Sequence, residues 1–249
     1  MAVDGQKIRQ IPYLRILYWL IALSLLAYLI SVTFNLIRLL YVATLGWSLL
    51  TGGVYLFRLA RRRPWIRIVT AVILLPFMLY LAAAGTPPDR DALRQAYLWR
   101  LRSFERVLYV WGGETHVGID CSGLARMALC EAMVSAGVQT RNPRLLGPLL
   151  WRCWWQDLSA GAIGEGYRDS TVPVGHAPRL AGFAAPWLQP GDLAVSHNRT
   201  HVLIYLGRRQ WIEANPEDGC VVIHTAAHDS TRGYFNMPME VVRWTLLAE

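Results

Sequence analysis

One cysteine stands where the chain is expected to turn from a glycine-rich extended segment into a helix. Cys121 follows Asp120, a common N-cap residue, and residues 124–134 are good helix formers with apolar residues at helical spacing. Gly137 is expected to end this helix. Cys121 would then lie in the first turn, where unpaired N–H groups and the helix dipole favour negative charge, so a thiol ionises more readily. The sequence thus offers a candidate nucleophile, although a cysteine can also serve as a small buried apolar residue.

A nucleophilic thiol needs a proton acceptor, and the last third of the chain supplies candidates. Short β-rich runs alternate there with turn residues, which predicts an antiparallel meander. His201 begins the run at residues 201–207, so its ring would project from a rigid strand. An imidazole there could take the thiol proton and later give it to a leaving amine. The six histidines of the chain are His116, His176, His197, His201, His224 and His228.

Strand alternation narrows the position of a third group that could hold the imidazole. A three-residue turn at residues 207–209 would place Asn215 opposite His201 and Glu213 diagonally on the same face. A two-residue turn would move both side chains to the other face. Glu213 and Asn215 are therefore the two candidates, and the pattern alone leaves the choice open.

The first third of the chain has the composition of a membrane anchor. Residues 13–34, 39–57 and 65–84 are almost free of charge, and each segment is close to the roughly 20 residues of a spanning helix. Because they are apolar on all sides, we expect three transmembrane helices within residues 1–85. One or two spans with an interfacial helix are the main alternative.

The distribution of basic residues predicts the orientation of this anchor. Three spans would place eight basic residues on one side of the membrane and only Arg38 in the opposite connection. The eight are Lys7, Arg9, Arg15, Arg58, Arg61, Arg62, Arg63 and Arg67. Basic residues stay on the cytoplasmic side, so the chain beyond residue 84 is expected outside the cytoplasm.

The positive charge of the chain belongs to the predicted anchor. Residues 1–85 hold nine of the 25 basic residues and only one of the 17 acidic residues, which leaves the remainder with no formal net charge. The anchor therefore explains the net charge of +8, and we expect a lipid bilayer as a partner and no nucleic acid.

The rest of the chain, residues 86–249, is expected to form one α+β domain. A linker at residues 85–91 precedes a predicted helix at residues 92–108. The region 139–189 is rich in glycine and proline and is the hardest to interpret. It contains the tryptophan-rich stretch 149–158, which we expect to be helical and to serve core or lid packing.

Four motifs of this domain resemble those of the NlpC/P60 family. YVWGG (109–113), DCSG (120–123), LQPGDL (188–193) and HVLIYLG (201–207) follow one another in the order and approximate spacing of that family. The resemblance covers residues 92–249 and implies a papain-like core, a helix bearing cysteine on an antiparallel sheet. It implies a cysteine peptidase acting on peptidoglycan stem peptides, often at the D-glutamyl to diamino acid bond.

The resemblance also implies roles for single residues. Cys121 would be the nucleophile and His201 the base, while Tyr109, Asp120 and Ser122 would line the substrate site and bind the amino end of the peptide.

The sequence departs from the family pattern at two positions of the site. Leu203 stands where a glycine is common, which could change the groove beside His201. Glu213 stands twelve residues after His201, where the third catalytic residue is often histidine. A carboxylate can also accept the imidazole N–H, so activity through Cys121, His201 and Glu213 is still expected.

Two other functions are compatible with parts of this sequence. A catalytically inactive, wall-binding membrane module would explain why the departures lie near the site. A Cys-His acyltransferase acting on lipid would explain the anchor, but in related lipid-acting families the histidine precedes the cysteine. A transglutaminase-like enzyme shares the order of residues but not the DCSG and PGDL motifs.

Metal and disulfide sites are less well defined. HNRTH and HTAAH space histidines by four residues, but a ligand pair at that spacing needs a helix, so we expect no metal and no cofactor. Outside the cytoplasm, Cys130, Cys153 and Cys220 could form one disulfide, and the sequence does not choose the pair.

Overall fold

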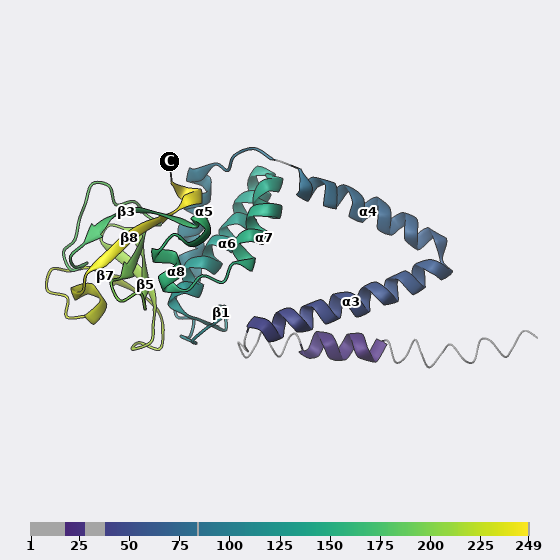
Figure 1. The fold of residues 1–249 in the computed structure, drawn as a ribbon, viewed down its shortest axis with the longest axis horizontal. Coiled ribbons are helices and arrows are strands. Elements are labelled where there is room, and N and C mark those ends of the chain that lie inside the picture. Colours follow the sequence, from purple (N-terminus) through teal and green to yellow (C-terminus); the bar gives the residue numbers. More distant parts are fainter. Residues whose placement is uncertain (1–17, 28–37, 84, 249) are drawn as a thin grey trace, which may run out of the picture. The chain divides into compact units, whose positions relative to one another are not determined.

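The chain divides into two compact units, which are described separately. The computed structural model describes residues 18–27, 38–83 and 85–248, shown as a ribbon in Figure 1. The first unit comprises Met1–Met78 and the second Leu79–Glu249.

The N-terminal part of the described chain consists of apolar helices. A short helix covers Tyr18–Ala27, and the remainder of the predicted span 13–34 lies outside the described residues. Helix α3 (Arg38–Arg62) and helix α4 (Pro64–Ala82) cover the other two predicted spans. α3 runs five residues further than expected because the segment RLARR contains good helix formers. Pro64 begins α4, a position where its missing N–H costs nothing.

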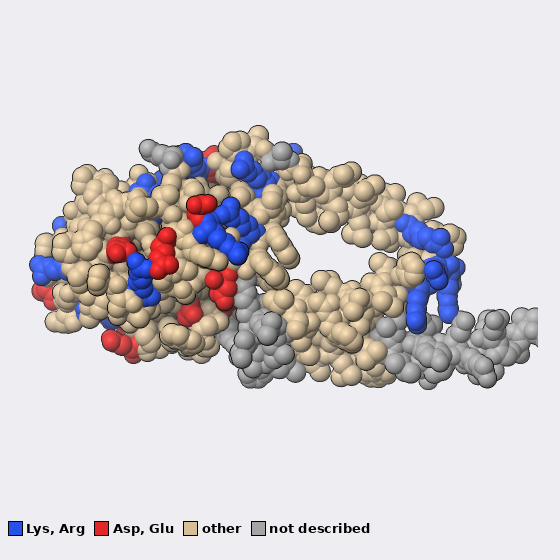
Figure 2. All heavy atoms as spheres, in the orientation of Figure 1, with Lys and Arg blue, Asp and Glu red and all other residues tan. Residues whose placement is uncertain are grey.

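Most large apolar side chains of these helices are exposed. None of the residues of α4 is buried, and the large apolar side chains of this helix are exposed along its length. By length and composition alone, α4 and residues Val42–Arg62 of α3 could each cross a membrane. Figure 2 shows basic side chains gathered where α3 passes into α4, and Arg61 and Arg62 form the last turn of α3 there.

The second unit is built on a six-stranded antiparallel sheet with the order β3-β8-β4-β5-β6-β7. Its strands are β3 (Thr171–Ala177), β4 (Leu193–Ser196), β5 (Val202–Gly207), β6 (Gln210–Asn215), β7 (Cys220–Thr225) and β8 (Met239–Trp244). The predicted meander is confirmed, because β4 to β7 are consecutive neighbours. β3 and β8 extend the sheet at the β4 edge and were not predicted.

Two helices cover one face of this sheet. α5 (Arg90–Ser103) and α6 (Cys121–Thr140) lie side by side in Figure 1. α5 confirms the predicted helix 92–108 with shifted bounds, because it begins two residues earlier and ends five residues earlier than expected. Their apolar residues form the main core with every second residue of β5, namely Val202, Ile204 and Leu206. α6 is apolar and long enough to resemble a membrane span, but 67% of its most apolar window is buried, so the core uses its apolar surface.

The end of α6 differs from the expectation. The helix continues through Gly137 and ends after Thr140, where Arg141 adopts the left-handed conformation. Gly137 serves close packing instead, because a Cβ atom at this position would lie 2.8 Å from side-chain atoms of Leu146.

Short elements complete the unit. A small hairpin joins β1 (Glu114–Thr115) to β2 (Gly118–Ile119) before α6. After α6 come η1 (Leu145–Leu149), α7 (Leu150–Trp155), α8 (Ala160–Gly164) and η2 (Tyr167–Asp169), and near the C-terminus η3 (Gly233–Asn236) and η4 (Thr245–Leu247). α7 confirms the expected helix in the tryptophan-rich stretch.

The opposite face of the sheet carries a second apolar cluster. Leu203 and Trp211 from the sheet pack there with Leu180 and Phe235 from the loops that cover this face. Leu203 is fully buried, so the side chain that replaces the expected glycine fills this core and does not line an open groove.

Candidate active site

Cys121 is the first residue of α6, as the sequence predicted, and Asp120 is its N-cap. The Oδ1 atom of Asp120 accepts hydrogen bonds from Gly123 N at 2.6 Å and from the Ser122 hydroxyl at 3.0 Å, while Oδ2 accepts one from Gly112 N at 2.9 Å. The side chain thus fixes the start of the helix to the preceding loop. Cys121 is 7% exposed, so only a small part of its side chain is accessible to solvent.

Glycine allows the loop before α6 to pack against the helix end. A Cβ atom at Gly123 would lie 2.4 Å from the carbonyl oxygen of Gly113, so only glycine permits this approach. Just behind the loop, Glu114 forms an ion pair with Arg126 of α6, and both side chains are buried. These contacts explain why two glycine motifs separated along the chain meet at Cys121.

The same loop carries Tyr109, which lies half-buried near Cys121. Its backbone N–H donates to Gly219 O at 2.8 Å, and it forms a bridge with Ile119, so it is attached to both sides of the site. Burial raises the pKa of Tyr109 to about 12, and the negative charges of Cys121 and Asp120 act in the same direction. Tyr109, Asp120 and Ser122 therefore lie together around the start of α6.

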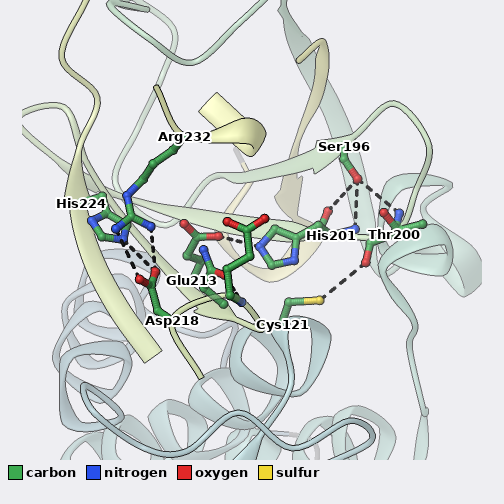
Figure 3. A network of polar contacts seen from close by, with 10 residues as sticks. Cys121, Ser196, Thr200, His201, Glu213, Asp218, His224 and Arg232 are labelled. Atoms are coloured by element: carbon green, nitrogen blue, oxygen red, sulfur yellow. Dashed lines mark hydrogen bonds and ion pairs between the residues drawn. The ribbon is translucent and has the colours of Figure 1, made fainter. Parts of the chain in front are cut away.

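His201 lies directly before β5, and a serine fixes its backbone. The hydroxyl oxygen of Ser196 accepts hydrogen bonds from His201 N at 3.0 Å and from Thr200 N at 3.2 Å (Figure 3). The carbonyl oxygen of Thr200 lies 3.9 Å from the sulfur of Cys121. The turn between β4 and β5 is thus fastened at the point where it faces the cysteine.

Glu213 of β6 contacts the imidazole directly. Its Oε2 atom lies 2.6 Å from Nε2 of His201, and the two side chains are 1% and 2% exposed. Figure 3 shows the His201 ring between Glu213 on one side and Cys121 on the other. Because Nε2 is engaged by Glu213, Nδ1 is the ring nitrogen left for the cysteine.

The β5–β6 connection differs from the predicted turn but keeps its register. Arg208 and Arg209 both have positive φ and form a two-residue turn, not the three-residue turn expected. A bulge between Tyr205 and Gly207 adds the missing residue, so Ile204 still pairs with Ile212. The faces of β5 and β6 therefore match the expectation.

The other candidate for the third position has a different partner. The Oδ1 atom of Asn215 accepts a hydrogen bond from Glu217 N at 2.7 Å and holds the β6–β7 turn. The structure thus brings Cys121, His201 and Glu213 together, whereas Asn215 ends β6 and its side chain bonds to the following turn.

The electrostatics of the site favour a charged imidazole. Burial disfavours the charged form of His201, but hydrogen bonds and charge interactions with Cys121 and Glu213 outweigh it and raise the pKa of His201 to about 9. The ring is therefore protonated at neutral pH when Cys121 is a thiolate.

Sequence reasoning missed an aromatic residue that covers the histidine. Tyr234 of η3 stacks on His201 with ring centroids 3.9 Å apart and ring planes 16° from parallel. Burial raises the pKa of Tyr234, with further contributions from Cys121 and Glu213. No local pattern places a residue 33 positions away over the ring, because loops on the far face of the sheet bring it there.

The loop that carries Tyr234 is tied down by a neighbouring ion pair. Arg232 donates to Asp218 at 2.7 Å, and His224 lies 3.4 Å from the same carboxylate (Figure 3). The hydrogen bond from Arg232 lowers the pKa of Asp218. This cluster lies beside the His201 and Glu213 pair but does not join it.

The PGD motif has a structural part in the unit. Asp192 accepts hydrogen bonds from Arg243 at 2.7 Å and 3.1 Å and from Gln189 N at 2.8 Å. Asp192 and Arg243 are both buried, so this ion pair fixes the start of β4 to β8.

The sequence matches the NlpC/P60 family over residues 106–237, which is more than half of the chain and contains every residue of the site. The chain belongs to the NlpC/P60 family. The match begins just after α5 and ends within the loop that follows Tyr234.

Solved structures of NlpC/P60 proteins are similar to this chain at low identity. A family member from Bacillus cereus ATCC 10987 shares 19% identity with a TM-score of 0.39 over 65% of this chain and 41% of its own. The peptidoglycan hydrolase RipB from Mycobacterium tuberculosis shares 22% identity with a TM-score of 0.39 over 65% and 67%. The P60 domain of an antigen from M. avium subspecies paratuberculosis shares 19% identity, with a TM-score of 0.39 over 64% and 98%.

These similarities are limited in extent. This chain spans only 41% of the length of the Bacillus cereus protein. No curated protein matches the chain in sequence. The family assignment rests on the sequence match over residues 106–237.

Proposed function

We propose that this protein is a membrane-anchored cysteine peptidase that hydrolyses amide bonds in peptidoglycan stem peptides. The observation that carries the proposal is the contact of His201 with Glu213 at 2.6 Å, beside a cysteine in the first turn of a helix. Membership of the NlpC/P60 family supports the substrate class.

Each group has a role in a two-step reaction. The Cys121 thiolate attacks the carbonyl carbon of the amide, and first-turn N–H groups of α6 favour the developing oxyanion. The His201 imidazolium gives its proton to the leaving nitrogen as the C–N bond breaks, which leaves a thioester on Cys121. His201 then takes a proton from water, the hydroxide attacks the thioester, and the thiolate leaves.

Glu213 acts in this scheme through His201. Its buried carboxylate accepts a hydrogen bond from the Nε2–H group, orients the ring and favours the imidazolium. The Oε1 atom of Glu213 is buried without a hydrogen-bond partner, so the charge of this carboxylate is directed at the histidine. A complete acid, base and nucleophile set supports an active enzyme over an inactive wall-binding module.

Substrate binding is assigned to the groups around the start of α6. Tyr109, Asp120 and Ser122 would bind the amino end of the stem peptide, in line with the family motifs that they match. Asp120 supplies negative charge close to Cys121, which suits an ammonium group.

The anchor proposal rests on exposure and charge. α4 buries none of its apolar side chains, and such a helix is stable in hydrocarbon and costly in water. The basic cluster at the end of α3 supports a cytoplasmic connection between α3 and α4. The catalytic unit would then face the outer side of a bacterial inner membrane.

Digestion of purified muropeptides by the full-length protein, read by mass spectrometry, tests the activity. We expect the intact chain to release stem-peptide fragments, and Cys121→Ala and His201→Ala to release none while remaining folded. Cys220→Ala is the matched control, because it removes a thiol on β7 and should keep activity. Equal turnover by Cys121→Ala would refute the mechanism.

A further inference from the structure

The tryptophan-rich helix α7 presents aromatic rings at the surface of the catalytic unit. Trp151 and Trp155 are 61% and 54% exposed, and their rings stack with centroids 5.4 Å apart. Trp154 contacts both rings at 5.8 Å and 6.1 Å. Of the two expected roles of this stretch, core or lid packing, the core role is therefore wrong for Trp151 and Trp155, which form an exposed aromatic surface.

The turn that precedes η1 and α7 contacts the point where the chain enters the catalytic unit. The side-chain amide of Asn142 donates to Thr86 O at 3.0 Å, and Arg144 packs against Gly85. The same turn leads directly into η1 and α7. Thr86 follows the last residue of α4 by only four positions, a stretch that spans at most about 14 Å. A membrane-spanning α4 would thus hold the turn before α7 near the bilayer surface.

The charges around the tryptophans suit a lipid interface. Arg152 is exposed on α7, and Arg141 and Arg144 are exposed in the turn that precedes η1. Tryptophan rings favour the headgroup level of a bilayer because they combine an apolar body with a polar N–H group, and arginine attracts lipid phosphate. In water, the apolar part of an exposed tryptophan ring has no apolar surface to contact.

We propose that Trp151 and Trp155, with the neighbouring arginines, bind the headgroup region of the phospholipid bilayer and hold the catalytic unit against the membrane. This inference rests on the membrane anchoring in the proposed function. A sugar ring of a glycan strand could also stack on tryptophan, but the short tether from α4 and the flanking arginines favour lipid. The unit would then be held at the membrane by two attachments, the covalent tether and α7.

Photocrosslinking of the full chain in nanodiscs of phosphatidylethanolamine and phosphatidylglycerol tests this proposal. The nanodiscs contain a phospholipid with a photoreactive group near its headgroup, and adducts are located by peptide mass spectrometry. We expect adducts on the α7 peptide, with a several-fold loss in the double variant Trp151→Ser, Trp155→Ser. Trp99→Ser is the matched control, because Trp99 is also 61% exposed but lies on α5, and it should leave the α7 adducts unchanged.

The pattern of adducts separates this inference from the anchor itself. Adducts on α3 and α4 with none on α7 would overturn the docking of α7 and leave the anchor intact. Absence of adducts from α3 and α4 as well would overturn the anchor together with the inference. Loss of α7 adducts on addition of peptide-free glycan fragments would show that Trp151 and Trp155 bind glycan, and would overturn the lipid proposal. Hydrolysis of soluble muropeptides should be unchanged in the double variant, which shows that it is folded.

Discussion

The carboxylate of Glu213 lies 2.6 Å from Nε2 of His201, and the rest of the protein shields both side chains from water. In this setting a charge-assisted hydrogen bond is strong, because neither partner is competing with solvent. The pair therefore fixes both the orientation and the protonation of the ring.

Replacement of Glu213 should separate its role from that of Asn215. Glu213→Gln keeps an acceptor but loses the charge, so we expect kcat/KM for muropeptides to fall roughly 10²-fold. Asn215→Ala loses a turn hydrogen bond to Glu217 and should have a small effect on kcat/KM. A large loss in Asn215→Ala with little loss in Glu213→Gln would assign the ring contact to Asn215.

The pH dependence of hydrolysis should follow His201. Because the pKa of His201 is raised to about 9, the ring stays protonated through neutral pH, and kcat/KM should decline as the pH rises through this value. In Glu213→Gln the decline should begin at lower pH. An identical pH profile of kcat/KM in the wild type and in Glu213→Gln would contradict the coupling between Glu213 and His201.

The same shift in the pKa of His201 also affects stability. The protonated ring stabilises the fold fully below pH 6.5 and progressively less as pH rises through 9.

The ring of Tyr234 should affect catalysis through stacking alone. Tyr234→Ala removes the ring from His201 and is expected to lower kcat/KM by up to roughly tenfold, whereas Tyr234→Phe keeps the ring and should retain most activity. Measurement of kcat and KM for both variants checks this. Equal losses in Ala and Phe would show that the hydroxyl is what matters.

The structure selects a pair among the three cysteines outside the site. The sulfur atoms of Cys130 on α6 and Cys153 on α7 lie 2.9 Å apart, while Cys220 lies on β7. If the catalytic unit is exported, we expect exchange with a disulfide donor to join Cys130 and Cys153 and to leave Cys121 and Cys220 reduced. Differential alkylation and mass spectrometry of protein from membranes measure this. Disulfide-linked peptides that contain Cys220 would contradict the pairing.

Local signals predicted the parts of the site that are close in sequence. Asp120 as N-cap and Cys121 in the first turn depend on a few neighbouring residues, and the cap bonds to Gly123 and Ser122 follow from them. The meander was predictable for the same reason, because each strand is followed by its own turn.

The parts that could not be predicted depend on distant contacts. β3 and β8 pair across more than 60 residues, and Tyr234 reaches His201 through a loop that no periodic pattern describes. The β5–β6 register was predicted correctly, but from a three-residue turn that the structure does not have. The bulge before Gly207 compensates for the shorter turn, and it has no clear signal in sequence. Gly137 resembled a helix end because its packing partner Leu146 lies beyond the helix.

Capture of the covalent intermediate tests the central claim most directly. The full-length protein is mixed with a purified muropeptide, quenched in acid within the first turnover and digested for mass spectrometry. The expected result is a thioester between the peptide that contains Cys121 and the acyl part of the stem peptide. This thioester should be absent in Cys121→Ser. Release of products by the wild-type protein with no acyl group on Cys121, and continued release by Cys121→Ala, would contradict the proposed mechanism.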